Sequence, residues 1–173
     1  KGNFSELAFD ILKGKNILFT GNGTAFNSSI QIKKKLSLKA NILNIDIELT
    51  NQDDKKITGL YACELNYSLL GGHTEDRYFL INGKKPAKYY MDSSGIEQKT
   101  KSITIVNEYD KFAVETKFLE STRLWRHPIF TISGSEAGLE KVYQSSVIIP
   151  NWKINLKPNE IKKIKFRIIV REL

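Results

Sequence analysis

The sequence predicts an all-β fold, a large antiparallel β-sandwich, from three observations. Apolar and polar residues alternate with period two in many short runs, whereas the 3.6-residue period of amphipathic helices is almost absent. Turn-forming residues such as Gly21-Asn22-Gly23 and Asn82-Gly83 separate these runs. About a dozen runs fit into the chain, which favours two large antiparallel sheets packed face to face.

The length and composition are those of one soluble globular domain. The chain has 173 residues, of which 40% are hydrophobic and 27% are charged. No apolar run approaches the roughly 18 residues that suggest a membrane span, so we expect no membrane partner. A single cysteine, Cys63, excludes an intrachain disulfide, and nothing in the sequence requires an oxidising compartment. We therefore expect a cytoplasmic location. Because the sequence begins with Lys1, we also expect it to be a piece of a longer polypeptide.

The formal charge of +8 raises the question of nucleic-acid binding. The excess is mostly lysine, and the lysines are spread over strand faces rather than gathered in one motif. A solvated lysine-rich surface that also blunts sheet edges explains this pattern better, so we expect no nucleic-acid partner.

The first half of the chain shows the clearest alternation. Short extended segments are predicted at 7–12 and 17–20, and longer strands at 30–38 and 43–49. In the last two, isoleucines and leucines alternate with lysines, acids and amides, as expected for antiparallel neighbours with one wet face.

Residues 60–82 combine a strand with a forced turn. Tyr61, Cys63 and Tyr67 fall on one face of an extended strand, and Glu64 and Asn66 fall on the other. A Gly-Gly break, the run His73-Thr74-Glu75-Asp76-Arg77 and a second strand at 78–81 follow. The stretch 84–101 has little periodicity and is predicted to be a long loop, a class of segment that is often functional.

The second half continues as strands at 102–106, 112–119, 122–132, 142–149, 152–156 and 163–171. Pro128 interrupts the third of these, so an edge or a bulge is expected there. Trp125 shares one side of its strand with Arg123 and His127, and Arg126 lies on the other side. The alternation places Tyr143 on the face of Ser145 and Val147.

The residues offer several sites for chemistry. Glu64, Asp76 and His73 could converge as an acid–base set, although local pairing of Asp76 with Arg77 explains these residues more simply. Aromatic side chains beside polar groups are how sugars are usually held, and Trp125 fits this role, whereas Trp152 is expected to fill core. Two histidines and one cysteine without metal-site spacing predict no metal and no cofactor.

Three runs carry a resemblance to a known family. They are YACELNYSLLGGHTEDRYFLING at 61–83, TRLWRHPIFTISGSEAGLEKVYQSS at 122–146 and IIPNWKINLKPNE at 148–160. These runs resemble the C-terminal domain of the alpha-amylases and 4-alpha-glucanotransferases of glycoside hydrolase family 57. The similarity covers nearly the whole chain, and the run from Asn66 to Tyr78 is its most specific part.

This resemblance implies a galactose-mutarotase-like β-sandwich without the family's catalytic residues, which belong to an N-terminal (β/α) barrel. The expected partners are that barrel, in the same polypeptide, and α-glucan. Relatives of this fold place sugar on one concave sheet face. The ligand-binding candidates implied by that analogy are Glu64, Asn66, His73, Asp76, Arg77, Trp125, Arg126, Tyr143 and Gln144.

Two other functions remain open at this stage. One is a stand-alone aldose mutarotase or epimerase that would use His73 or His127 with Glu64 or Asp76. The other is a basic interaction module, which only the charge suggests.

Overall fold

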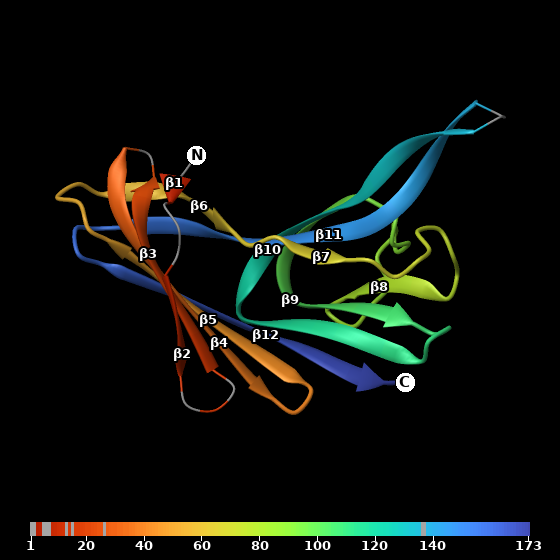
Figure 1. The fold of residues 1–173 in the computed structure, drawn as a ribbon, viewed down its shortest axis with the longest axis horizontal. Coiled ribbons are helices and arrows are strands. Elements are labelled where there is room, and N and C mark those ends of the chain that lie inside the picture. Colours follow the sequence, from red (N-terminus) through yellow and green to blue (C-terminus); the bar gives the residue numbers. More distant parts are fainter. Residues whose placement is uncertain (1–2, 5–7, 13, 15, 26, 136–137) are drawn as a thin grey trace. The chain divides into compact units, whose positions relative to one another are not determined.

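A computed structural model describes residues 3–4, 8–12, 14, 16–25, 27–135 and 138–173. This part of the chain contains strands and turns but no α-helix (Figure 1). In it, no helix has the length and apolar character needed to cross a membrane. The strands are β1 (Asn3–Phe4), β2 (Ala8–Leu12), β3 (Asn16–Ala25), β4 (Ser28–Lys39), β5 (Ile42–Asn51), β6 (Ile57–Ala62), β7 (Leu65–Tyr67), β8 (Arg77–Ile81), β9 (Gly95–Asn107), β10 (Phe112–Ser135), β11 (Gly138–Leu156) and β12 (Ile161–Glu172).

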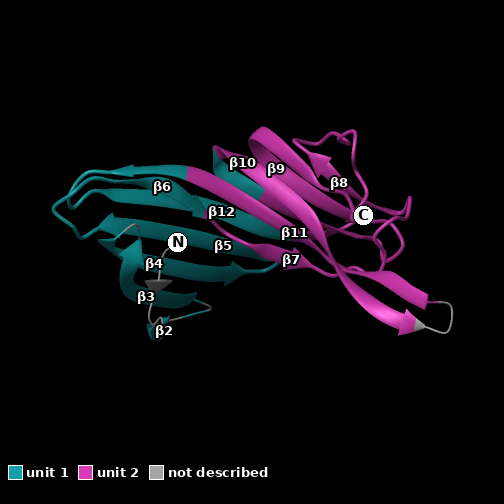
Figure 2. Cartoon of the chain, turned by 90° about the horizontal axis from the view of Figure 1, so that it is seen from above, with its two compact units in different colours: residues 1–61, 117–120, 153–169 teal, residues 62–116, 121–152, 170–173 magenta. Residues whose placement is uncertain are grey.

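The chain divides into two compact units, which Figure 2 distinguishes by colour. Unit 1 comprises residues 1–61, 117–120 and 153–169, and unit 2 comprises residues 62–116, 121–152 and 170–173. The long strands β10, β11 and β12 contribute residues to both units.

Unit 1 is built on the antiparallel neighbours β3, β4, β5 and β12. The register aligns Leu36, Ile45 and Phe166 in one row across three strands. The next residue on each strand points to the other face, where Lys35, Asp46 and Lys165 form a polar row. The alternation seen in the sequence therefore produces one apolar and one charged face.

Unit 2 contains β7, β8 and β9 together with most of β10 and β11. In it, β7 pairs with β11, β11 with β10, β10 with β9, and β9 with β8. Its fully buried side chains include Phe79, Met91, Ile103, Ile105, Leu124 and Ile148. Positive φ angles at Asn82 (50°) and Gly83 (80°) close the predicted hairpin turn after β8.

The prediction of an all-β fold with antiparallel pairing is confirmed. The hydrogen-bonding path connects the strands of the described residues in one sheet, since the longest strands continue through both units. Several boundaries differ from expectation. Strand β3 continues to Ala25 through the predicted turn at Gly21-Asn22-Gly23, and β10 and β11 each join two predicted strands. Leu7, at the start of the first predicted strand, lies outside the described residues. Strand β9 begins at Gly95 rather than near Ser102, so the predicted loop is shorter.

Candidate functional site

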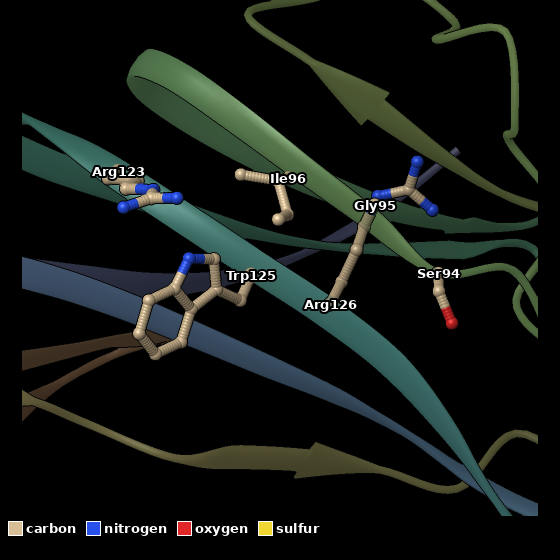
Figure 3. Close-up of a pocket in the computed structure, with 6 residues that line it drawn as sticks. All are labelled: Ser94, Gly95, Ile96, Arg123, Trp125 and Arg126. Carbon is tan, nitrogen blue, oxygen red and sulfur yellow. The ribbon is translucent and has the colours of Figure 1, made fainter.

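The site begins with an open pocket beside Trp125 in unit 2, shown in Figure 3. Its volume is about 430 Å³, and its lining residues are Ser94, Gly95, Ile96, Arg123, Trp125 and Arg126. The alternation of β10 carries Trp125 and Arg123 to the same face, and the start of β9 supplies Ile96, which is 61% exposed. The pocket thus joins an indole ring and an aliphatic side chain to an exposed guanidinium.

Polar groups complete this pocket. The guanidinium carbon of Arg123 lies 5.4 Å from the centroid of the Trp125 ring, within the range of a cation–π contact. The indole Nε1 of Trp125 is covered and has no hydrogen-bond partner in the described part of the chain. A buried donor without an acceptor is unfavourable, so this nitrogen carries an energetic cost within the protein.

Strand register shows which predicted residues share the Trp125 face. Trp125 pairs with Ile149, and His127 pairs with Val147, which in turn pairs with Asn66 of β7. Directly paired residues point to the same side of a sheet, so Asn66 lies on the Trp125 face. Strand β11 lies between Trp125 and Asn66, and Asn66 is displaced by two residues along the strands, so the two positions lie about 12 Å apart in the sheet. Both Asn66 and the neighbouring Glu64 are exposed, and the Asn66 amide donates to Glu64 at 2.9 Å.

Gln144 also lies at the rim of this face. Its side-chain amide donates to the Thr131 hydroxyl at 3.0 Å, and its backbone carbonyl accepts a hydrogen bond from Ser68 at 2.8 Å. Glu64, Asn66, Trp125 and Gln144 are therefore the predicted candidates that the sheet carries on one side.

Arg126 points to the opposite side of β10 and is only 3% exposed (Figure 3). Its guanidinium donates to the carbonyl of Lys88 at 2.6 Å, the hydroxyl of Ser93 at 2.6 Å and the carboxylate of Glu97 at 3.2 Å. Burial lowers the pKa of Arg126, and the Glu97 carboxylate opposes this effect. The expectation that Arg126 faces a ligand is corrected, because the protein itself uses its donors to hold the segment before β9.

Tyr143 also lies on the other face, contrary to the predicted alternation. The register between β10 and β11 shifts between Ile129 and Phe130, so that Ile129 pairs with Ser145 but Phe130 pairs with Tyr143. Gln144 is the extra residue of this bulge, which reverses the face of every residue beyond it. The Tyr143 hydroxyl lies 2.7 Å from Ser146 Oγ, and burial raises the pKa of Tyr143.

His73 belongs to a cluster of loop residues in unit 2, in which His73 and Glu75 are exposed and Tyr89, Tyr90 and Asp92 are half-buried. Its Nδ1 lies 3.1 Å from an Asp92 carboxylate oxygen, and its ring stacks on Tyr90 with centroids 3.9 Å apart. The hydroxyls of Tyr89 and Tyr90 both donate to Glu75. The bond to Glu75 raises the pKa of Tyr90, because the neutral phenol is the donor.

This cluster is tied to the Tyr143 face. The Asp92 amide donates to the Gly72 carbonyl at 3.0 Å, and a Cβ at Gly72 would lie 2.7 Å from the Tyr143 ring. His127, in contrast, lies on the Trp125 face by its pairing with Val147. The two histidines therefore lie on opposite faces of the sheet.

Asp76 and Arg77 form the local ion pair that the simpler interpretation anticipated, with 3.3 Å between Asp76 Oδ1 and Arg77 Nη1. The Arg77 side chain is 11% exposed, and its guanidinium carbon lies 5.1 Å from the Tyr109 ring centroid. These contacts hold the turn after Gly72 and account for both residues within the chain.

Sequence analysis missed part of each cluster. Ser94, Gly95 and Ile96 fell in a stretch predicted to be loop, and Asp92, Tyr89 and Tyr90 lay in that same stretch. The length and weak periodicity of 84–101 were the available signal, since long ordered loops often carry function. Which of its residues meet Trp125 or His73 depends on contacts between distant segments.

The comparisons with known proteins decide the family. A family model described as "Alpha-amylase/4-alpha-glucanotransferase, C-terminal" matches residues 1–166. The chain belongs to this family. Alpha-amylase 1 of Dictyoglomus thermophilum is 29% identical over 179 residues, which cover 97% of this chain and 24% of that protein. The chain spans about a quarter of the length of the curated relatives it matches.

Solved structures show the same fold. The 4-alpha-glucanotransferase of Thermococcus litoralis superposes with a TM-score of 0.66 and 17% identity, covering 96% of this chain and 22% of that one. A galactose mutarotase-like protein of Lactobacillus casei gives a TM-score of 0.69 with 10% identity, covering 96% of this chain and 73% of that one. The predicted galactose-mutarotase-like fold and the predicted family are thus confirmed.

Proposed function

We propose that this chain is a non-catalytic accessory domain of a longer α-glucan-processing enzyme. In that enzyme it packs on an N-terminal catalytic (β/α) barrel, and its Trp125 face contacts α-glucan. The observation that carries the proposal is the match of residues 1–166 to a C-terminal family of alpha-amylases and 4-alpha-glucanotransferases. The relatives are alpha-amylases and a 4-alpha-glucanotransferase, and their activities suggest the substrate class.

The arrangement of the carboxylates supports a non-catalytic role. Glycoside chemistry commonly needs two carboxyl groups facing one glycosidic bond. Glu64 accepts a hydrogen bond from Asn66 on the Trp125 face, whereas Asp76 pairs with Arg77 in the turn. Each predicted acid is therefore held in its own local contact.

The Trp125 pocket supports the contact with glucan. An indole ring can cover the apolar face of a glucose unit, while the exposed Arg123 guanidinium can donate to sugar hydroxyl oxygens. Asn66 and Glu64, across β11, would meet a neighbouring sugar unit of an extended chain. The buried Val147 and half-buried Ile149 lie between these two groups.

A binding titration tests the glucan contact. We expect maltoheptaose and soluble starch to bind the chain saturably, and Trp125→Ala to weaken this binding at least tenfold. Tyr109→Ala is the matched control, since it removes an aromatic ring that is 73% exposed and lies outside the pocket. Equal binding by the two variants, or none by the folded wild type, would contradict a Trp125 glucan site.

A second assay tests the absence of catalysis. We expect the purified chain to release no new products from maltooligosaccharides, as monitored by chromatography over a long incubation. Turnover that co-purifies with the chain and disappears in Glu64→Gln or Asp76→Asn would show that the chain is itself an enzyme.

A stand-alone aldose mutarotase is the second candidate, favoured only by the His73–Asp92 contact. A carboxylate that holds one imidazole nitrogen leaves the other available as a base. His127 cannot assist from the opposite face of the sheet. Polarimetry of fresh α-glucose decides this candidate: a rate above background that His73→Ala abolishes would support it, and the background rate alone would remove it.

A further inference from the structure

Unit 2 extends beyond its other strands as a two-stranded ribbon, formed by residues 129–134 of β10 and 138–145 of β11. We call this ribbon the arm. Strand β7 pairs with β11 only at residues 146–148, and the arm lies beyond that pairing. Figures 1 and 2 both show the paired strands projecting from the rest of unit 2.

The far part of the arm is entirely exposed. Residues 131–134 and 138–142 are all exposed, although several of them are large aliphatic residues. Leu139 is 82% exposed, Ile132 is 63% exposed, and Ile129 and Val142 are each 40% exposed. Exposed apolar side chains gathered on one element mark an interaction site more often than scattered ones do.

The register places the two most exposed apolar residues, Ile132 and Leu139, on one face of the arm, and Ile129 and Val142 on the other. Phe130 pairs with Tyr143, Ile132 pairs with Lys141, and Gly134 pairs with Leu139. Residues two apart on a strand share a face, so Phe130, Ile132, Leu139 and Tyr143 form one strip, which we call the apolar strip. Lys141 lies on the same face, with its ammonium 3.9 Å from the centroid of the Phe130 ring. The strip starts at the edge-to-face contact of Phe130 with Tyr143 and ends at Leu139.

A free arm of this kind is unfavourable in water. An isolated two-stranded ribbon is marginally stable at best, and it normally needs a further strand or a packed surface on its apolar face. Its unpaired edges and exposed aliphatic residues would also invite aggregation. Within the described part of the chain, Gly72 lies against the Tyr143 ring at the base of the strip, whereas Ile132 and Leu139 at its outer end stay exposed. The cover for this outer end therefore has to come from elsewhere.

We propose that the apolar strip of the arm packs on the remainder of the enzyme polypeptide to which this domain belongs. This inference rests on the proposed accessory function and names the element that makes the contact. About three quarters of the length of the curated relatives lies outside the part that matches this chain, so a large covering surface is available.

The size of the strip favours a tethered partner over a second copy. Two strands of about five residues present about 170 Å² on one face. A stable interface between free molecules buries about 800 Å² on each partner. A domain in the same polypeptide needs no such area, because the tether supplies a high effective concentration.

Hydrogen exchange compares the isolated chain with the full-length enzyme. We expect the amides of 131–134 and 138–142 to exchange at least tenfold more slowly in the full-length enzyme. Protection elsewhere in this domain without protection of the arm would overturn the arm proposal and leave the accessory role intact. No protection anywhere in the domain would instead reject the packing role itself.

A variant pair separates docking from folding. Ile132→Ser combined with Leu139→Ser removes the outer strip, and Leu119→Ser is the control, since Leu119 is 75% exposed on β10 outside the arm. We expect the double variant to lower the melting temperature of the full-length enzyme and to abolish arm protection, while the melting temperature of the isolated chain stays unchanged. An equal effect on both proteins would contradict docking.

Sedimentation of the isolated chain tests the second-copy alternative. We expect a monomer at micromolar concentration for the wild type and for the double variant. A wild-type dimer that the double variant dissociates would show that the strip binds another copy, and it would overturn the proposal.

Discussion

Trp125 and Arg126 show how two adjacent residues acquire opposite roles. The indole lines an open pocket, whereas the guanidinium is 3% exposed and bonded to the segment before β9. Because side chains alternate along β10, Trp125 and Arg126 are predicted to point to opposite faces, but the alternation does not show which face other segments cover. From sequence alone, an arginine is expected to bind a ligand or to lie on the surface. The burial of Arg126 depends on the packing of a distant segment, the one before β9.

Replacing Arg126 tests this structural role. We expect Arg126→Met to lower the free energy of unfolding by about 2–4 kcal/mol, because it leaves the Glu97 carboxylate and the Lys88 carbonyl without their donor. Arg123→Met, at an exposed position on the same strand, should change it by less than about 0.5 kcal/mol. Urea unfolding measures both, and similar losses for the two variants would refute a special role for Arg126.

Buried tyrosines predict a loss of stability in alkali. Burial raises the pKa of Tyr67 and of Tyr143 above the unfolded value of about 10. Above that pH the unfolded chain releases phenolic protons that the folded chain retains, so stability falls as pH rises. This contribution is present in full below about pH 10 and is lost as the pH rises through the folded pKa values.

Urea unfolding between about pH 8 and pH 11 measures this slope. We expect Tyr67→Phe to flatten it, because phenylalanine has no proton to release. The exposed Tyr109→Phe should leave the slope as it is in the wild type. A wild-type free energy of unfolding that stays constant up to pH 11 would contradict the expected effect of Tyr67 and Tyr143 on stability.

At the scale of the element, β4 and β5 of unit 1 were predictable, whereas the continuation of β3 through Gly21-Asn22-Gly23 and the bulge of unit 2 were not. Two clean alternations fixed the faces of 30–38 and 43–49, and β4 and β5 confirm them as antiparallel neighbours. Pro128 predicted an irregularity, and the register shift lies one residue further, between Ile129 and Phe130. The sequence of β11 does not mark Gln144 as the extra residue, so Tyr143 was placed on the wrong face.

The close contact between β9 and β10 requires a residue without a Cβ at position 95. A Cβ at Gly95 would lie 2.7 Å from Arg126 Nη2, and that guanidinium is buried and held by several hydrogen bonds. We expect Gly95→Ala to cost about 1–3 kcal/mol and to change the fluorescence of Trp125. Gly134→Ala, where a Cβ would meet no atom within 4 Å, should change stability by less than about 0.5 kcal/mol. Equal stabilities of the two variants, by chemical denaturation, would argue against this close packing.

At the scale of the whole molecule, the sequence named candidate residues but did not show which face of the sheet each of them occupies. Trp125, Asn66, Glu64 and Gln144 share a face, as the sheet analogy implied, whereas Arg126 and Tyr143 occupy the other. The motifs identified the family because they span most of the chain. They could not sort these residues by face, since that depends on one bulge and on the loop packed over Tyr143.

The distribution of charge bears on the basic-module hypothesis. On the polar face of unit 1, Glu48 lies between Lys33 and Lys163, and Asp46 lies between Lys35 and Lys165. Glu48 and Asp46 form ion pairs with Lys163 and Lys165 at 3.1 Å and 3.4 Å. Cross-strand rows of alternating sign explain these four lysines by pairing within the sheet.

We therefore expect only weak, non-specific binding of double-stranded DNA. The net charge of +8 should give some retention at low salt, and that retention should disappear near 0.15 M salt, where the Debye length is about 8 Å. Fluorescence anisotropy with a labelled duplex, titrated over salt, measures this dependence. Lys33→Gln combined with Lys35→Gln should weaken the low-salt binding, whereas Lys153→Gln alone should alter it little. Saturable binding that persists above 0.15 M salt would instead favour the basic-module hypothesis, since screening leaves only specific contacts at that ionic strength.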